Sequence, residues 1–131
     1  MPAQDPELAA APAPRRVIIV DDDHDIRESL AEVLSECGFE TMAASNGQVA
    51  LEALERQPAS IILLDLMMPV MDGWQFREQQ LQRPRLAGIP VIVVSADSNV
   101  GEKAAALDAD AYLVTPIHIA DLLKVLDELL P

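Results

Sequence analysis

The sequence is poor in cysteine, aromatic residues and positive charge, and each shortage limits what the protein can be. Cys37 is the only cysteine, so no disulfide can form within the chain, and we expect a packed thiol there. Aromatic residues make up 3% of the chain, which argues against the stacking platforms that bind single-stranded nucleic acids. The formal net charge of -13 would repel a phosphate backbone, so direct binding to DNA or RNA is not expected.

Long hydrophobic runs are also absent. Runs such as 17–20 and 61–64 are far shorter than the roughly 20 residues that cross a bilayer, so no membrane span is expected. Residues 1–14 alternate proline and alanine without a cationic start, which is unlike a secretory signal and indicates a disordered, partly polyproline-like tail. The remainder, 15–131, is predicted to be one cytoplasmic domain, since 50% of the 131 residues are hydrophobic and can fill a core.

Short apolar segments alternate with segments of helical periodicity along the chain. Strands are predicted at 17–20, 39–44, 61–64, 91–94 and 111–114. Helices are predicted at 25–37, 47–57, 74–83, 99–107 and 119–130. Strands that are apolar on both faces are typical of a parallel sheet covered by helices on each side, so the alternation predicts a doubly wound α/β fold.

Polar residues follow four of the predicted strands. In a doubly wound sheet, ligands bind outside the carboxyl ends of the strands, so these residues are expected to share one pocket. They are Asp21-Asp22-Asp23, Asp65, Ser95-Ala96 and Thr115-Pro116. Clustered carboxylates raise one another's pKa unless a cation joins them, and oxygen ligands without histidine or cysteine favour a hard cation such as Mg²⁺. Asp25 is expected to cap the following helix instead.

Asp65 is the candidate nucleophile of this pocket. A carboxylate beside a divalent cation can attack phosphorus and form an acyl phosphate, while the metal neutralises charge on the transferred group. Ser95 is placed to donate its hydroxyl to the phosphoryl oxygens. Taken singly, Asp65 and Ser95 are equally compatible with residues that merely end a strand.

Four segments together resemble the receiver domain of bacterial response regulators, of the chemotaxis-regulator-like, single-domain kind. They are Val20 to Asp23, Leu64 to Gly73, Ser95-Ala96 and Ala109 to Pro116. The resemblance covers nearly everything after residue 14 and implies a flavodoxin-like (βα)5 fold with a five-stranded parallel sheet in the order 2-1-3-4-5. It also implies two-component phosphorelay signalling with no enzymatic activity beyond self-phosphorylation from a phosphodonor and weak autodephosphorylation.

The same resemblance implies roles for individual residues. Asp65 would be the phosphoacceptor, and Asp21 and Asp22 would bind Mg²⁺ together with it. Met67 would offer its backbone carbonyl to the metal. Ser95 would be the switch hydroxyl.

Signal output is expected through a surface, because no further domain follows the last predicted helix. The resemblance implies that Tyr112 reports the switch to a face formed by 99–107, 111–114 and 119–130. The partners implied are a histidine kinase or histidine phosphotransfer protein, and a downstream target on that face. The last helix carries more apolar residues than one buried stripe needs, which is compatible with a homodimer, although these residues can instead fold inward. They are Leu122, Leu123, Val125, Leu126, Leu129 and Leu130.

One position departs from the family pattern. The residue before the proline that follows the fifth strand is normally a lysine in this family, and here it is Thr115. Threonine offers a hydroxyl but no positive charge, and losing one preorganised electrostatic partner costs about 2.7 to 4 kcal/mol in catalytic sites. An atypical phosphorylated receiver and a phosphorylation-independent pseudo-receiver that binds a partner therefore both stay open. The family resemblance also favours a cis peptide bond before Pro116.

Two other functional classes fit less well. Phosphatases of the haloacid dehalogenase type place a second acid two positions after the nucleophile, where this chain has Met67. A flavin carrier of the same fold needs a loop of small residues for the flavin phosphate after the first strand, and Asp21 to Asp23 would repel it.

Overall fold

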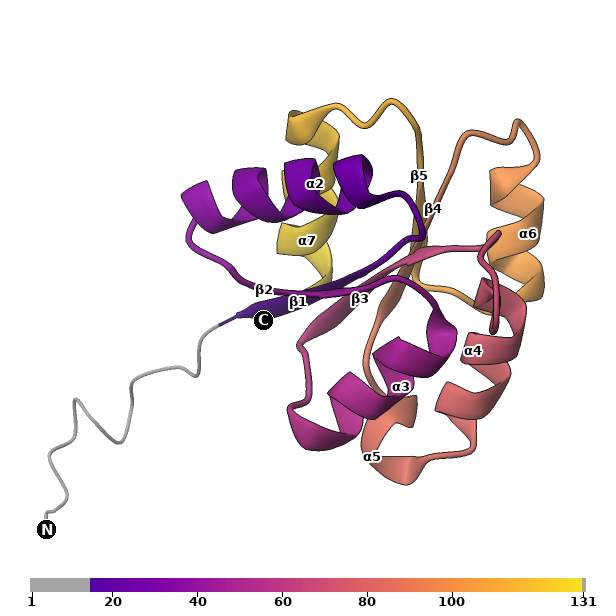
Figure 1. Ribbon diagram of the computed structural model, residues 1–131. Helices are drawn as coiled ribbons and strands as arrows, with labels where there is room; N and C mark the ends of the chain where they lie inside the picture. The colour runs from indigo at the N-terminus through magenta and orange to yellow at the C-terminus, as the bar shows by residue number, and fades with distance from the viewer. Residues whose placement is uncertain (1–14, 131) are drawn as a thin grey trace, which may run out of the picture.

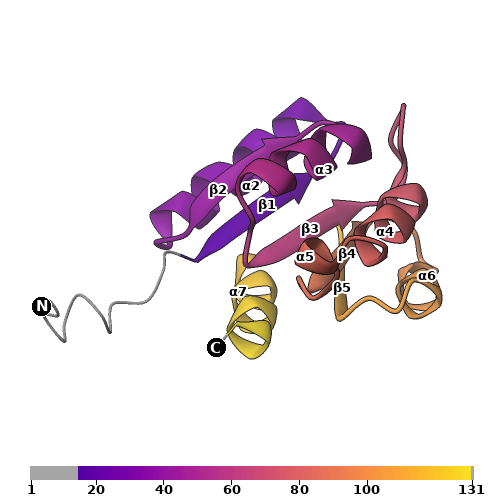
Figure 2. The same cartoon turned by 90° about the horizontal axis from the view of Figure 1, so that it is seen from below.

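Five short strands of aliphatic residues form the centre of the structure, a computed structural model that describes residues 15–130. The predicted tail, 1–14, and Pro131 lie outside the described residues. The strands are β1 (Arg16–Val20), β2 (Glu40–Ala44), β3 (Ile61–Asp65), β4 (Val91–Ser95) and β5 (Ala111–Val114). All neighbouring pairs are parallel and the order is β2-β1-β3-β4-β5, which confirms the predicted fold and strand order (Figure 2).

Helices cover both faces of this sheet (Figure 1). They are α2 (His24–Glu36), α3 (Gly47–Arg56), α4 (Gly73–Leu81), α5 (Pro84–Ala87), α6 (Val100–Ala106) and α7 (Ile119–Leu129). On one face, α2 and α7 pack against one core cluster, while α3, α4, α5 and α6 pack against the other. The strands serve both clusters because alternate residues point to opposite faces: Ile18 belongs to one and Ile19 to the other.

The helix starts explain several element boundaries. Asp23 caps α2, with its carboxylate accepting from the backbone N–H groups of Asp25 and Ile26, so the prediction that Asp25 is the cap was wrong. The sequence offers several acids in a row there, and the one whose backbone is extended becomes the cap. Asp72 caps α4 in a reciprocal capping box with Gln75.

The structure corrects other expectations about packing. Cys37 is exposed rather than packed. The apolar residues of α7 fold inward: Leu122, Leu126 and Leu130 are buried, and the other three pack against the same core cluster. The apolar excess of this helix is therefore used by the core and gives no support to a homodimer. None of the described helices has the length and apolar composition needed to cross a membrane.

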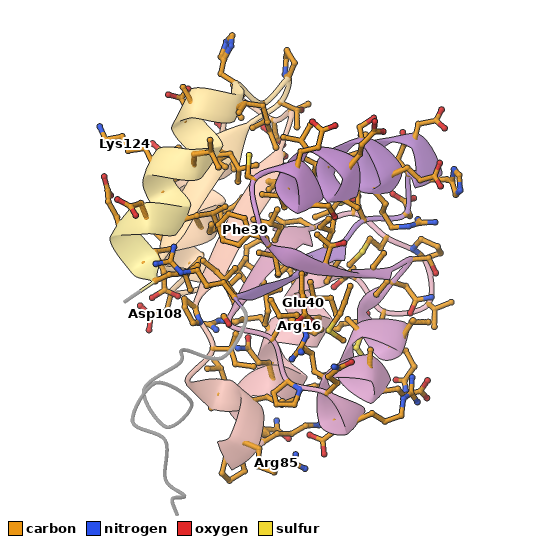
Figure 3. All side chains as sticks on the ribbon, turned by 90° about the vertical axis from the view of Figure 1, so that its left-hand side faces the viewer. Arg16, Phe39, Glu40, Arg85, Asp108 and Lys124 are labelled. Carbon is orange, nitrogen blue, oxygen red and sulfur yellow. The ribbon has the colours of Figure 1, made fainter. Side chains whose placement is uncertain are left out.

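An ion pair joins β2, the strand at one edge of the sheet, to its neighbour β1. Arg16 on β1 donates from Nε and Nη2 to Oε1 of Glu40 on β2, at 3.1 and 2.9 Å (Figure 3). The register places the same two residues opposite one another. This pair therefore reinforces the strand alignment that the hydrophobic pattern requires.

A second polar cluster, formed by Arg77 and Gln80 of α4, is buried between α4, α5 and the end of α6. Arg77 donates to the carbonyl oxygens of Leu107 and Asp108 at 3.0 and 2.6 Å, and to Oε1 of Gln80 at 2.9 Å. The side-chain amide of Gln80 donates to the carbonyl oxygens of Leu86 and Ile89. We call these two residues the Arg77–Gln80 cluster. It fastens three helices together through backbone carbonyls at and just beyond the ends of α5 and α6.

Candidate functional site

The strand register brings the predicted site segments to one edge of the sheet. Val20 lies beside Leu64, and Asp65 lies beside Val94. Ser95 is paired in turn with Val114, the residue before Thr115. Residues that are far apart in the sequence therefore lie at the same edge of the sheet, where the strands have their carboxyl ends.

Three carboxylates meet at this edge and form what we call the acid cluster: Asp21, Asp22 and Asp65. Each offers an oxygen atom, and the three atoms lie within 4.8 Å of one another. Asp21 is buried, Asp65 is half-buried and Asp22 is exposed. The cluster is thus open to solvent on one side and closed by the sheet on the other.

The electrostatics of the acid cluster are unfavourable without a cation. Burial, reinforced by the charge on Asp21, raises the pKa of Asp65 from 3.8 to about 7. Burial also raises the pKa of Asp21, and the charges of Asp22 and Asp23 add to this effect. In the folded protein, burial and mutual repulsion therefore both act against ionisation of these carboxylates, and a nearby cation would favour it.

Hydrogen bonds fix Asp21 on three sides. Its N–H donates to the carbonyl of Ala44 on β2 at 3.0 Å, and its carboxylate accepts from the N–H of Asp23 at 2.9 Å. Its carbonyl oxygen accepts from Nη1 of Arg27 at 2.7 Å. Because backbone and side chain are both restrained, the carboxylate is held in place before any ligand arrives.

Asp65 is held by the loop between β3 and α4. Its carboxylate accepts from the N–H of Met67 at 3.4 Å, a long contact. Gly73 packs against the end of β3, where a Cβ atom would lie 2.6 Å from the carbonyl oxygen of Asp65. Glycine is therefore required at 73 so that the start of α4 can approach the end of β3.

Ser95 and the loop after β4 form the next part of the edge. The Ser95 hydroxyl oxygen accepts from the N–H of Asp97 at 3.0 Å, which leaves its own O–H free to donate elsewhere. Asp97 accepts a short bond of 2.5 Å from Nζ of Lys103 on α6. That bond lowers the pKa of Asp97, so the two side chains form an ion pair that ties the loop to α6.

The loop after β5 completes the edge. Thr115 is half-buried, and its N–H donates to the carbonyl of Ser95 at 3.0 Å. The Thr115–Pro116 peptide bond is cis, as predicted. Tyr112 lies further from the site on β5, is 50% exposed, and packs its ring over Gly101 of α6. Tyr112 is therefore on the surface that borders α6, and not among the residues of the acid cluster.

The donor set suits a hard divalent cation. Three carboxylates without histidine or cysteine are the ligands that Mg²⁺ prefers, and a cation would offset the burial and the repulsion that together raise the pKa of Asp65. The Met67 carbonyl stays a prediction as a fourth ligand. Among the described residues, Asp21, Asp22 and Asp65 form a group able to hold a metal.

Two residues near the site were missed by sequence reasoning. Arg27 has the spacing of an ordinary helix arginine, and only the structure shows that its head group turns back to Asp21. Gly73 follows Asp72 in what the sequence indicates is a loop, so its close approach to Asp65 was not visible. Arg27 carries no signal in a single sequence beyond its residue type, whereas Gly73 belongs to the segment that resembles the receiver family but was given no role there.

Comparison with known proteins identifies a matching family. The model of the response regulator receiver domain matches residues 17–127 of the chain. Transcriptional regulatory protein GltR of Pseudomonas aeruginosa is 36% identical over 118 residues, which are 88% of this chain and 49% of that protein. Response regulator MprA of Mycobacterium leprae is 38% identical over 117 residues, 88% of this chain and 50% of that protein. The chain therefore spans about half the length of these curated relatives.

Solved structures agree in fold. Chemotaxis protein CheY4 of Vibrio cholerae superposes with a TM-score of 0.83 at 28% identity, covering 90% of this chain and all of that one. A response regulator receiver protein from Pseudomonas putida gives a TM-score of 0.81 at 26% identity, covering 90% and 99% of the two chains.

Proposed function

Because the chain belongs to the response regulator receiver domain family of two-component signalling, we propose that it accepts a phosphoryl group on Asp65 in the presence of Mg²⁺ and thereby switches a protein-binding surface. The observation that carries this proposal is the acid cluster, with three carboxylate oxygens within 4.8 Å of one another. Residues 15–131 would act as the receiver domain, in the cytoplasm.

In the proposed reaction, a carboxylate oxygen of Asp65 attacks the phosphorus of a phosphohistidine or of a small donor such as acetyl phosphate. An O–P bond forms at Asp65, the bond from phosphorus to the donor breaks, and the donor leaves with the electron pair. Bound Mg²⁺ would supply charge neutralisation at the transferred group. Asp21 and Asp22 would hold that ion, and the Ser95 hydroxyl would donate to a phosphoryl oxygen.

The proposed receiver is atypical because Thr115 stands where the family has a lysine. The hydroxyl of Thr115 can donate one hydrogen bond but cannot neutralise charge. Both lysines of the chain are on helices, Lys103 paired with Asp97 and Lys124 exposed on α7. We therefore expect slower phosphorylation or weaker coupling than in a lysine-containing receiver, by an amount near the 2.7 to 4 kcal/mol typical of a lost electrostatic partner, or about 100- to 1,000-fold in rate.

Two surfaces are proposed for partners. A histidine kinase or phosphotransfer protein would contact α2 and the loops near Asp65, where a hollow of ≈ 550 Å³ is lined by α2 residues and by Thr115, Pro116 and Ile117. A downstream target would contact the face formed by α6, β5 and α7, where Tyr112 and Val114 are each 50% exposed. Both surfaces adjoin segments that end at the same edge of the sheet as the acid cluster, so we expect occupation of the site to change them.

Direct chemistry tests the proposal. The protein is incubated with acetyl phosphate or beryllofluoride plus Mg²⁺, Trp74 fluorescence is followed, and the modified residue is mapped by mass spectrometry. We expect modification at Asp65 and a fluorescence response, both lost in Asp65→Asn. An unmodified Asp65, together with no response to either reagent, would rule out the phosphoacceptor role.

Thr115 favours a second candidate, a pseudo-receiver that binds its partner without phosphotransfer. This candidate predicts that affinity for the partner is the same for wild type and Asp65→Asn, and the same with Mg²⁺ or with a chelator. The phosphoacceptor proposal predicts that both changes alter that affinity. Binding measured by calorimetry under the four conditions separates the two.

A further inference from the structure

A positive charge from α2 lies against the acid cluster. Arg27 is at the end of the first turn of α2, is half-buried, and donates from Nη1 to the carbonyl of Asp21 at 2.7 Å. Its charge also opposes the rise in the pKa of Asp21. Because its head group is hydrogen-bonded and partly withdrawn from water, Arg27 is a fixed charge at the wall of the site.

Other cationic side chains are committed elsewhere. Lys103 pairs with Asp97 at 2.5 Å, and Arg77 is buried among the carbonyls of α6. Lys124 points outward from α7 (Figure 3). Arg27 is thus a cation that already contacts a residue of the acid cluster.

The charges of the proposed phosphorylated state leave an excess of negative charge. A divalent cation is balanced by Asp21 and Asp22, while phosphorylation converts the carboxylate of Asp65 into a neutral acyl group. The phosphoryl group itself carries close to two negative charges at neutral pH. Thr115 supplies no charge to offset them, so a nearby guanidinium changes the stability of that state.

We propose that Arg27 supplies part of the positive charge that stabilises the phosphoryl group on Asp65, in the role that Thr115 cannot fill. The inference rests on the proposed function and deepens it. Arg27 acts here as a positioning residue whose charge is felt through space, since its recorded hydrogen bond is to Asp21. A cation attracts an anion and repels a second cation, so its removal must weaken anion binding without weakening Mg²⁺ binding.

Two variants of the full chain test this prediction of opposite effects. Arg27→Met keeps a long apolar stem and loses the charge, while Arg27→Lys keeps the charge and loses the planar fork. Dissociation constants for Mg²⁺, and for beryllofluoride at saturating Mg²⁺, are measured by Trp74 fluorescence and in parallel by thermal shift. We expect Arg27→Met to weaken beryllofluoride binding about fivefold, from the Coulomb energy of a partly screened pair. Mg²⁺ binding should stay equal or tighten, and Arg27→Lys should restore the anion response.

A merely structural role gives a different pattern. If Arg27 only fixes the backbone at Asp21, Arg27→Met weakens the binding of Mg²⁺ and beryllofluoride alike, and this result overturns the inference. Should Arg27→Met fail to fold, Arg27→Gln, which keeps an N–H donor without the charge, gives the same comparison. A wild-type chain that responds to neither reagent would instead overturn the proposed function itself.

Adding the missing lysine provides an independent check. Thr115→Lys should restore, in the Arg27→Met background, the beryllofluoride affinity that the loss of the Arg27 charge removes, because both charges act on the same anion. If Thr115→Lys strengthens beryllofluoride binding in wild type but does not restore it in Arg27→Met, the defect of Arg27→Met is not one of charge, and the inference is overturned.

Discussion

The Arg77–Gln80 cluster is buried whereas the acid cluster is open to solvent on one side, and the two differ in where their partners come from. Each polar atom of Arg77 and Gln80 named above has a partner inside the chain, and no buried side-chain nitrogen or oxygen in residues 15–130 is left without one. The acid cluster instead gathers like charges at a partly buried edge, and burial, reinforced by the charge on Asp21, raises the pKa of Asp65 to about 7. The fold satisfies the polar groups of the first cluster, whereas the second keeps an excess of negative charge that a cation can balance.

The largest effect is expected from removing the hydrogen-bond donors of Arg77 in the Arg77–Gln80 cluster. Arg77→Met keeps the buried stem but leaves the carbonyls of Leu107 and Asp108 without their donor, so we expect a loss of about 3 kcal/mol in the free energy of unfolding. Urea denaturation followed by Trp74 fluorescence measures it. Arg85→Met is the matched control, because Arg85 is largely exposed and its ion pair with Glu55 contributes about 0.5 kcal/mol or less. Equal losses for the two variants would contradict the comparison.

The second largest effect is expected from removing the ionisable carboxyl of Asp65 from the acid cluster. The pKa of the Asp65 carboxyl is 3.8 in the unfolded chain and about 7 in the folded protein. Between these two pH values the folded state therefore binds one more proton than the unfolded state. Its contribution to stability is therefore greatest below pH 4 and is lost as the pH rises through 7. After allowance for solvent screening, we expect wild type to lose about 2 kcal/mol more than Asp65→Asn between pH 4 and pH 8. Urea titrations at the two pH values decide this, and parallel pH profiles would show that Asp65 is not the group responsible.

A divalent cation should remove the same destabilisation. Binding to the folded state alone adds about 1.4 kcal/mol at a Mg²⁺ concentration ten times the dissociation constant. We expect a rise in melting temperature with MgCl₂ at pH 8, reversed by a chelator and much reduced in Asp22→Asn. Asp25→Asn is the matched control, since Asp25 is an exposed acid close to the cluster but outside it. A rise of equal size in both variants would place the ion elsewhere.

The smallest effects are expected from backbone strain at the two residues other than glycine that have positive φ. Both lie in the left-handed region: Val70 has φ 68° near the acid cluster and Asp108 has φ 55° at the Arg77–Gln80 cluster. A β-branched residue is strained there, while aspartate tolerates it. Val70 is 81% exposed, so Val70→Gly loses little packing and should stabilise the protein by about 1 kcal/mol. Asp108→Gly should change the free energy of unfolding by only about 0.3 kcal/mol. A thermal melt in which Asp108→Gly has a larger effect than Val70→Gly would contradict this prediction.

The sequence predicted the fold well because apolar strands of regular spacing leave little choice. Residues 17–20 and 61–64 are apolar on both faces, and both segments became central strands with the predicted partners. The short helix α5 was missed because its four residues carry no periodicity. The burial of Arg77 and Gln80 was not predicted, since polar residues on a helix are usually solvated and only tertiary contacts reveal otherwise.

The candidate site was partly predictable for a different reason. Parallel strands end at a common edge, so residues such as Asp21 and Asp65 that directly follow strands could be placed together from topology alone. Contacts made by side chains from other elements, such as Arg27 from α2, depend on rotamers and loop paths that a pattern does not encode. The roles of Ser95, Thr115 and Met67 stay predictions.

The bond from the Thr115 N–H to the Ser95 carbonyl belongs to the main chain. Any residue except proline at 115 can make it, so the mechanical connection between the ends of β4 and β5 does not depend on the side chain carried there. The charge of the side chain at 115 can therefore change without loss of the main-chain hydrogen bond. A lineage can exchange the charge at 115 while the strand ends remain joined, which gives receivers a route to new reaction rates on an unchanged frame.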